Sequence, residues 1–232
     1  MNRVVGYDGF APIYDRWSAD MTEDIEFYVE LAREVEGPIV ELAVGTGRVA
    51  IPIAELTGRK VIGIDSSPAM LAVARERAAS AGVELDLREG DMRDFSLEEP
   101  AALVICPFRS LLHLPTWSDR RRVFERVAAA LRPEGRFAWN AFAFDHRIAD
   151  PLDGQWQEEP IRHRIDYAPA DSRIDIAVED GPHISLWWVS RSEWEGLLEV
   201  SELEIEALYG WFDRRPFDHE SREFVWVARK RG

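Results

Sequence analysis

The stretch Glu41-Leu-Ala-Val-Gly-Thr-Gly-Arg-Val-Ala-Ile-Pro-Ile-Ala-Glu55 decides the fold of this chain. A short apolar run ends there at two glycines, Gly45 and Gly47, and a second apolar run follows them. Glycine lets a backbone pass close to a ligand, where a Cβ atom would clash. The pattern G-x-G-x-x-A is typical of a strand-to-helix turn that holds a nucleotide, and by itself it does not say which nucleotide.

Segments of strand and helix character alternate around this turn. The expected strands are the apolar runs 39–44, 60–65, 83–91, 102–108 and 136–142. The expected helices run from the N-cap Thr22 to the stop at Gly37-Pro38, from Arg48 to Leu56, from Ser67-Pro68 onward, and from the N-cap Ser118 to Leu131. This alternation predicts βαβ units in a mainly parallel sheet, whose ligand lies beyond the carboxyl ends of the strands.

The pattern changes after residue 150. Apolar and polar residues alternate over 161–167, 174–179 and 184–188, with a turn signal at Asp180-Gly181. This predicts a three-stranded antiparallel meander with one apolar face. A helix at 192–200 and strands at 203–208 and 223–228 are expected to complete the main sheet. We therefore expect one domain over 1–232, with an N-terminal lid segment and helix at 1–36 and an inserted antiparallel β cap at 152–190.

Composition narrows the class of protein. The net charge is −15, from 28 basic and 43 acidic side chains, which disfavours a nucleic-acid backbone or a polyanionic membrane surface as partner. The single cysteine, Cys106, excludes an internal disulfide and a multi-cysteine metal site, and no other metal-ligand cluster is evident. No apolar run approaches transmembrane length, so we expect a soluble, cytoplasmic protein.

A carboxylate stands at the place where a nucleotide ribose would need one. Asp65 ends the second expected strand, about twenty residues after the glycines, where it can accept hydrogen bonds from ribose hydroxyls. Both NAD and S-adenosylmethionine carry an adenosine ribose, so this feature does not separate them.

The wider set of motifs resembles the class I S-adenosylmethionine-dependent methyltransferases, over nearly the whole chain. The motifs are E-L-A-V-G-T-G-R at 41–48, GIDSSPAML at 63–71, GDMRDF at 90–95, LRPEGRFAW at 131–139 and the terminal FVWVARK at 224–230. The resemblance implies a Rossmann-like α/β fold, a seven-stranded mainly parallel sheet with an antiparallel terminal strand and helices on both faces. It also implies S-adenosyl-L-methionine as cofactor and S-adenosyl-L-homocysteine as product. The cofactor-binding residues that it implies are Tyr14, Glu41, Ala43, Gly45, Thr46, Gly47, Arg48, Asp65, Ser66, Met70, Asp91, Met92, Arg93 and Pro107.

The acceptor side is similar to amino-sugar N-methyltransferases and to glycine and sarcosine methyltransferases. That likeness rests on YDGFAPIYDRW at 7–17, on GDMRDF and on S-x-x-H-L at 110–114. It implies that Tyr14 lies close to the sulfonium, and Tyr7, Arg109, Trp187 and Trp188 are expected to bind the substrate, with Trp156 as a further wall of an aromatic pocket. His113 and His146 follow the fourth and fifth strands, so either is a candidate general base, and Tyr14 joins them as a candidate catalytic residue.

Pro107, Phe108 and Arg109 stand where many family members place an acidic residue or Asn. This departure disfavours the nucleic-acid amino-group methylases, and the metal-dependent catechol type lacks its carboxylate pair here.

The sequence thus predicts transfer of a methyl group from S-adenosylmethionine to an N or O atom of a small-molecule acceptor, by in-line displacement. Three alternatives remain open: a catalytically silent S-adenosylmethionine-binding sensor or partner protein, an NAD-dependent oxidoreductase, and a methyltransferase with a protein acceptor. The acceptor, its reacting atom and the choice between monomer and homodimer are also open.

Overall fold

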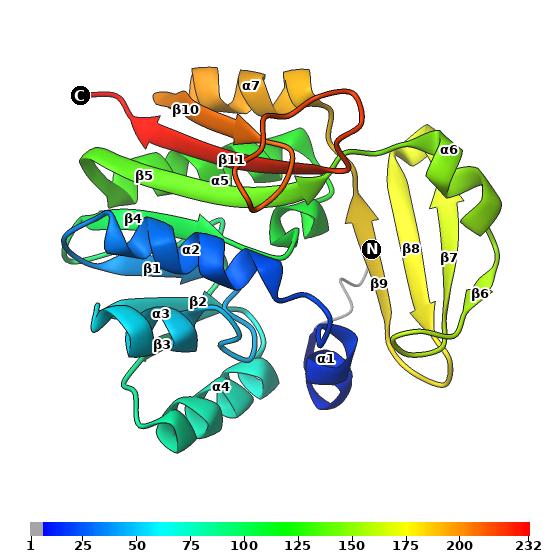
Figure 1. The fold of residues 1–232 in the computed structure, drawn as a ribbon, viewed down its shortest axis with the longest axis horizontal. Coiled ribbons are helices and arrows are strands. Elements are labelled where there is room, and N and C mark those ends of the chain that lie inside the picture. The colour runs from blue at the N-terminus through cyan, green and yellow to red at the C-terminus, as the bar shows by residue number, and fades with distance from the viewer. Residues whose placement is uncertain (1–6) are drawn as a thin grey trace.

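A computed structural model describes residues 7–232 and shows two sheets (Figure 1). The main sheet has seven strands in the order β10-β11-β5-β4-β1-β2-β3. Their bounds are β1 Ile39–Leu42, β2 Val61–Asp65, β3 Asp86–Glu89, β4 Ala101–Cys106, β5 Leu131–Phe142, β10 Leu203–Tyr209 and β11 Glu223–Lys230. β1 to β5 pair in parallel, whereas β11 runs antiparallel to both β5 and β10. The predicted mainly parallel sheet with an antiparallel terminal strand is confirmed.

Helices cover both faces of this sheet, as predicted. The long helices are α2 Glu23–Arg33, α3 Ala50–Thr57, α4 Pro68–Ala81, α5 Trp117–Ala130 and α7 Arg191–Val200. Buried side chains of α2 and α3 pack on one face, around Tyr28 and Ile53. Those of α5 and α7 pack on the other face, where Phe124 and Trp194 enclose Trp139 of β5. Burial of such large apolar groups is the main favourable term in folding.

Local chemistry explains where two of the helices begin. The Ser67 side chain accepts from the Met70 amide and Pro68 occupies the first turn, so α4 begins as predicted. The predicted N-cap of α5, Ser118, is wrong. Thr116 is the extended cap residue, and its hydroxyl accepts from the Asp119 amide at 3.0 Å, which satisfies a donor that Ser118 inside the first turn does not reach.

Several bounds differ from the predicted ones. α3 begins at Ala50 rather than Arg48, and β3 is limited to four residues because only these pair with β2. β5 begins at Leu131, before the expected turn, because Leu131 pairs with Ala101 ahead of a register shift. The turn signal at 132–135 therefore produces a bulge within the strand rather than a break before it.

The second sheet is the predicted antiparallel insertion, with one strand more than expected. Its order is β6-β7-β8-β9, with bounds Trp156–Gln157, His163–Ala168, Arg173–Val178 and His183–Trp187. The extra strand, β6, pairs only two residues with β7, which is too short for an alternating pattern to reveal. Ile174, Ile176 and Val178 of β8 are buried, which confirms the single apolar face.

The N-terminal segment lies between the two sheets. It forms η1 Tyr7–Gly9 and α1 Ala11–Trp17, and Figure 1 shows α1 between the main sheet and β9. Phe10 packs with Met70 of α4 and Val178 of β8, so the segment joins the two sheets. The remaining short helices are η2 Ser110–His113, α6 His146–Ala149, η3 Asp150–Leu152 and η4 Pro169–Asp171. Residues 1–6 of the predicted lid lie outside the described residues.

Within residues 7–232, no helix has the length and apolar character needed to cross a membrane.

Candidate functional site

The glycine turn after β1 takes the conformation that its sequence requires. Gly45 and Gly47 have φ values of 56° and 78°, in the left-handed region that side chains rarely adopt. A Cβ atom on Gly47 would lie 3.0 Å from the Ile51 side chain. Ala43, just before the turn, also has a positive φ of 54°. The backbone is therefore held in a tight, partly strained turn at the carboxyl end of β1, which is where strain is often found at functional sites.

Asp65 joins this turn to the next helix. One oxygen of its carboxylate accepts from the Gly45 amide at 2.8 Å, and the other accepts from the Ser67 amide at 2.8 Å. Burial raises the pKa of Asp65 above its usual value, and the amides of Ser67, Gly45 and Ser66 oppose that shift. The two motifs predicted to bind one ligand are thus connected through a single carboxylate.

Glu41 lies inside β1 and is almost fully buried. Among the described residues its Oε2 atom has no hydrogen-bond partner. Burial raises the pKa of this carboxyl well above its ordinary value, while the nearby Arg48 acts in the opposite direction. A buried acceptor without a donor is costly, and a bound ammonium group would remove that cost.

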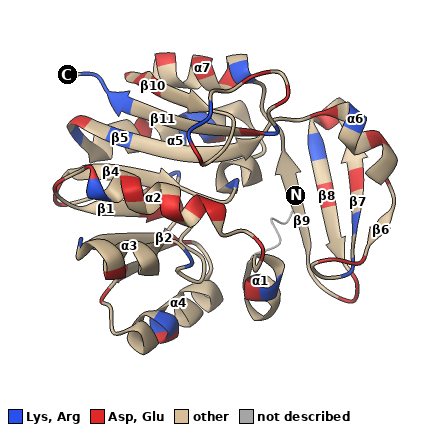
Figure 2. Cartoon of the chain, viewed as in Figure 1, with Lys and Arg blue, Asp and Glu red and all other residues tan. Residues whose placement is uncertain are grey.

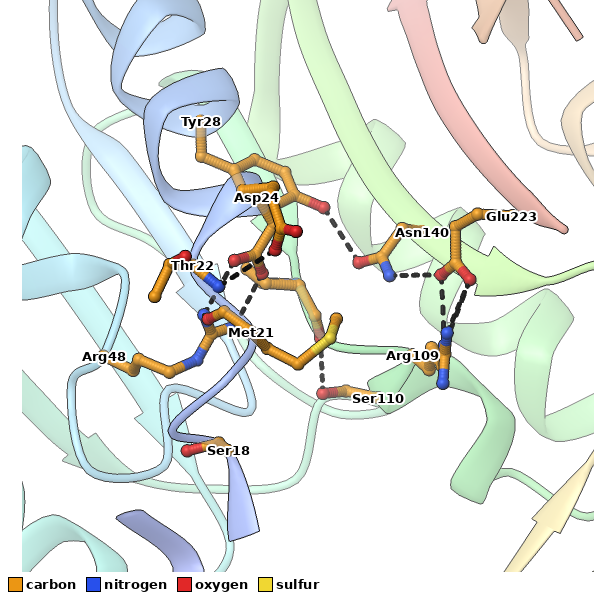
Figure 3. Close-up of polar contacts among 12 residues, drawn as sticks. Ser18, Met21, Thr22, Asp24, Tyr28, Arg48, Arg109, Ser110, Asn140 and Glu223 are labelled. Atoms are coloured by element: carbon orange, nitrogen blue, oxygen red, sulfur yellow. Dashed lines mark hydrogen bonds and ion pairs between the residues drawn. The ribbon is translucent and has the colours of Figure 1, made fainter. Parts of the chain in front are cut away.

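The Arg48 side chain is occupied by the protein itself. It donates to both oxygens of Asp24 at 2.7 and 2.6 Å and to the Met21 carbonyl at 2.7 Å (Figure 3). Its guanidinium also lies 4.9 Å from the centre of the Phe108 ring. Arg48 was expected to bind the cofactor, but its side chain instead connects the glycine turn to α2.

The motif after β3 forms a charged pair at the rim. Arg93 donates from Nη2 to Asp91 at 2.6 Å and from Nη1 to Asp119 at 2.9 Å. The hydrogen bonds from Arg93 hold the pKa of Asp91 below its usual value, against the opposing effect of partial burial. The Asp91 carboxylate stays half-exposed, so it keeps acceptor capacity for a ligand. Met92 is partly buried beside it, whereas Met70 lies deep against the N-terminal segment.

The N-terminal segment closes over these motifs. The Tyr14 ring lies over Gly45, where an added Cβ would be 3.8 Å from it. Asp8 accepts from the Ser67 hydroxyl at 2.6 Å, and Asp15 accepts from the Thr46 hydroxyl at 3.0 Å and from Arg77 at 2.6 Å. Sequence reasoning missed the roles of Asp8, Asp15 and Arg77, because their partners are 31 to 62 residues away and only the aspartate-rich composition of the segment hinted at them.

A neutral pair links the segment to the cap. The hydroxyl of Tyr7 and Nε2 of His113 are 2.6 Å apart, and Nδ1 of His113 is 3.3 Å from the Ser185 carbonyl oxygen of β9. A carbonyl only accepts, so Nδ1 carries the proton and Nε2 accepts from the Tyr7 hydroxyl. Burial lowers the pKa of His113 from 6.5 to about 4 and raises that of Tyr7 well above 10. This low pKa makes His113 a weaker base than an ordinary imidazole, and its catalytic role stays a prediction.

Aromatic rings continue from this pair to the glycine turn. Tyr7 meets Tyr14 edge to face with ring centres 6.5 Å apart, and Tyr14 meets Phe108 at 6.0 Å. Phe108 follows Pro107 at the end of β4. The structure therefore brings together Tyr7, Tyr14 and His113, three of the candidate site residues, at the carboxyl ends of β1 and β4.

A buried polar chain holds Arg109 (Figure 3). Its Nε and Nη2 atoms donate to Glu223 of β11, with a shortest distance of 2.8 Å. Asn140 of β5 donates to the same carboxylate at 2.6 Å and accepts from the Tyr28 hydroxyl at 3.1 Å. Sequence reasoning missed Glu223, Asn140 and Tyr28. The only available signal was a carboxylate and an amide in otherwise apolar strands.

The other predicted acceptor residues do not converge with this site. His146 and Trp188 line a separate hollow of about 660 Å³ between α6, the start of α7 and the loop before β11. Trp188 stacks there on Phe144, with ring centres 3.9 Å apart. Trp187 and Trp156 lie on β9 and β6, the opposite edges of the second sheet. The expected aromatic pocket of Trp187, Trp188 and Trp156 is therefore wrong.

Charges of both signs lie on the second sheet. Acidic and basic residues mix along β7 and β8 (Figure 2), and neighbours such as Arg164 with Asp166 and Arg173 with Asp175 pair with each other. A nucleic-acid backbone is bound by a continuous basic surface, and this face of the cap does not provide one.

Comparisons with known proteins agree on one kind of relative. A family profile described as "Methyltransferase domain" matches residues 39–135. The chain is 35% identical over 226 residues to "Putative methyltransferase YqeM" of Bacillus subtilis (strain 168), covering 94% of this chain and 80% of that protein. It is 33% identical over 129 residues to the dTDP-3-amino-3,6-dideoxy-alpha-D-glucopyranose N,N-dimethyltransferase of Streptomyces fradiae, covering 56% and 47%. The solved CcbJ methyltransferase from Streptomyces caelestis superposes with a TM-score of 0.82 at 25% identity, covering all of both chains.

Proposed function

This chain belongs to the class I S-adenosylmethionine-dependent methyltransferases, and we propose that it methylates an amine nitrogen of a small-molecule acceptor. S-adenosylmethionine supplies a methyl group activated by a sulfonium, so the protein need only align the acceptor, the methyl carbon and the sulfur, and exclude water. The matching family model and the relatives named above are methyltransferases, which favours this activity over a silent binding protein or an NAD-dependent oxidoreductase.

The donor side fits this cofactor. The unpartnered oxygen of Glu41 suits the ammonium of the methionine part, and the turn at Gly45 and Gly47 suits a closely approaching ligand. Asp65 would accept from the ribose hydroxyls, and Asp91 with Met92 would face the adenine. Ala43, Thr46, Ser66, Met70, Arg93 and Pro107 would complete the walls, with Tyr14 as the cover.

The low basicity of His113 is the observation that favours a nitrogen over an oxygen as the reacting atom of the acceptor. A hydroxyl acceptor usually needs a base, whereas an amine needs only to arrive neutral. His113 is buried with a pKa of about 4, and its unprotonated nitrogen, Nε2, already accepts a hydrogen bond from the Tyr7 hydroxyl. An imidazole of such low basicity is a poor base for a hydroxyl. The site therefore supports an acceptor that needs no deprotonation before it attacks.

Tyr7 is the group that would orient the amine. Because its hydroxyl proton points at His113, the lone pairs of its oxygen remain free to accept from an acceptor N–H. This hydrogen bond would turn the nitrogen lone pair toward the methyl carbon. His113 acts through Tyr7 here as a positioning residue rather than as a base, and Tyr14 and Phe108 shield the transfer point from water.

The acceptor class follows from the relatives and from the cap. The Streptomyces fradiae relative is named for an amino-sugar substrate that it dimethylates, so an amino sugar is the first class to examine. The cap at 152–190 would cover the acceptor, because Ser185 of β9 holds His113 in place. The segment at 1–36, as far as it is described, would cover the donor.

The test is a methyl-transfer screen with S-adenosylmethionine that carries a deuterated methyl group. Amino sugars are compared with sugars that carry a hydroxyl in place of the amine, and products are read by mass spectrometry. We expect labelled N-methyl products from the amines alone. Transfer to the matched hydroxyl compounds, with none to the amines, would contradict the proposal.

A further inference from the structure

The polar chain behind Arg109 is costly to build. The Glu223 side chain is fully buried, and removing a carboxylate from water is unfavourable unless the carboxylate is well paired. Phe108 and Arg109 also take left-handed backbone conformations, with φ values of 55° and 62°, which are unfavourable for residues other than glycine. A hydrophobic side chain at position 223 would close this end of the sheet more cheaply.

The buried Glu223 and the strained backbone at Phe108 and Arg109 hold the Arg109 guanidinium in place, although part of it is still exposed. Glu223 pairs with Nε and Nη2, the side edge of the guanidinium, and the Arg109 side chain keeps 37% of its surface exposed. Among residues 7–232, the Nη1 atom has no hydrogen-bond partner. Figure 3 shows this end of the guanidinium pointing away from Glu223. Its end edge, Nη1 with the second N–H of Nη2, has the geometry that binds an oxyanion with two hydrogen bonds.

Arg109 lies at the same edge of the sheet as the proposed transfer point, because it follows β4 and its guanidinium lies 5.6 Å from the centre of the Phe142 ring, at the carboxyl end of β5. Arg109 directly follows Phe108, whose ring meets Tyr14 over the glycine turn. Arg48, whose guanidinium lies over the Phe108 ring, already has its charge paired with Asp24. Asn140 and Glu223 hold Arg109 from the sheet side, so the guanidinium has little freedom to swing away.

We propose that Arg109 anchors an oxyanion on the acceptor, a carboxylate or a phosphate ester carried by the amine, and that Glu223 and Asn140 position it. This inference rests on the proposed function, since it names a second group on the same acceptor. The acceptor class becomes amines with a negative charge near the reacting nitrogen, and Arg109 selects them over neutral amines.

The experiment compares matched amines that differ in that charge. Glucosamine 1-phosphate is set against glucosamine, and glycine against glycinamide, with kcat and KM measured separately. We expect at least one charged member to have a KM about tenfold or more below that of its neutral partner, as for a hydrogen bond to a charged group. The pair that shows the effect identifies the oxyanion as phosphate ester or carboxylate.

Variants of Arg109 and Glu223 test whether Arg109 binds the oxyanion of the acceptor or only holds the loop after β4 against β11. Arg109→Gln should raise KM for the charged amine to that of its neutral partner and leave the neutral amine unchanged, and Arg109→Lys should restore part of the difference. Glu223→Gln should raise the same KM by a smaller factor. The matched control is Arg229→Gln, which removes a similar pair with Glu204 at the other end of β11 and should change neither KM.

Binding separates failure of the anchor from failure of the proposed function. Inorganic pyrophosphate is titrated calorimetrically into the protein saturated with S-adenosylhomocysteine. Anion binding that Arg109→Gln abolishes would support the anchor even if no amine were methylated. Equal kcat/KM for charged and neutral amines, or an equal loss for both in Arg109→Gln, would overturn the anchor and leave amine methylation standing.

Discussion

The two halves of the site differ in how they are made. In the donor half, Gly45 and Asp65 are 20 residues apart and belong to neighbouring strands, and the groups that face the ligand are carboxylates. In the acceptor half, Tyr7 and His113 are 106 residues apart, His113 and Ser185 are 72 apart, and all three groups are neutral. One half therefore binds a charged ligand through local motifs, and the other orients a neutral nucleophile through long-range contacts.

This difference teaches which half should respond to which change. Substitutions of the donor-half carboxylates should act on donor affinity, while loss of the neutral hydrogen bond between Tyr7 and His113 should act on the rate of transfer. The four predictions below use that division and would break it if their effects crossed over.

The largest effect is expected for Asp65→Ala. The substitution removes the acceptor of the Gly45 and Ser67 amides and the proposed partner of two ribose hydroxyls. We expect the dissociation constant for S-adenosylmethionine to rise about a thousandfold, since each hydrogen bond to a charged group contributes roughly 1.5–3 kcal/mol. Calorimetry measures it, with Asp94→Ala as a control at an exposed carboxylate outside the site. An unchanged constant would remove Asp65 from the donor site.

The second prediction concerns acid stability and His113. Its folded-state pKa, about 4, lies below the ordinary 6.5, so the unfolded chain binds more protons between these values and stability falls as the pH falls through them. Relative to His113→Gln, the wild type should lose up to about 3 kcal/mol between pH values above 6.5 and below 4. Urea unfolding at several pH values measures the difference. A difference that does not vary with pH would mean that the imidazole is not buried in the neutral form.

The third prediction concerns Glu41→Gln, which should affect ligand-free and ligand-bound protein in opposite ways. Burial raises the pKa of this carboxyl above its ordinary value of 4.5, so the folded chain loses stability as the pH rises from the ordinary value through the raised one, and the cost disappears at lower pH. The variant should unfold at a higher temperature near neutral pH, a gain that shrinks as the pH falls. Its donor affinity should drop about tenfold, or roughly 1.4 kcal/mol. A lower melting temperature near neutral pH would show that the carboxylate stabilises the fold.

The smallest effect is expected for Tyr7→Phe. The change removes one neutral hydrogen bond, worth about 1 kcal/mol, and keeps the ring that packs on Phe10 and Tyr14. We expect kcat to fall about fivefold while the dissociation constant for S-adenosylmethionine is unchanged. Tyr167→Phe is a control at a tyrosine of the cap outside the cluster. A selective loss of donor affinity would place Tyr7 in the donor half.

The same division explains how much could be predicted from the sequence. The mainly parallel sheet, the glycine turn and Asp65 follow from periodicity and short motifs, because their partners lie in adjacent βαβ units. The meeting of Tyr7 with His113 was expected only as a shared region, since no pattern encodes a contact over 106 residues. His146 and Trp188 were assigned by their position in the chain alone, and the structure places them in another hollow, where α6 and the residues after β9 meet.

Arg109 illustrates the remaining limit. The sequence indicated a substrate-binding arginine after β4, but its pairing with Glu223 depends on the antiparallel return of β11 beside β5. Buried polar groups in apolar strands are informative only once their neighbours in the sheet are known. A single carboxylate in an otherwise apolar strand therefore indicates a position of interest, but the sequence alone does not predict which residue it pairs with.

The pH dependence of methyl transfer tests the central claim most directly. The rate is measured from low to high pH with two amine acceptors of different basicity, in the wild type and in His113→Gln. The account predicts that the rate rises with pH through the pKa of whichever amine is used, in both proteins, because the amine alone must lose a proton. A midpoint that is the same for both amines and disappears in His113→Gln would show that the histidine is a base, and would contradict the account.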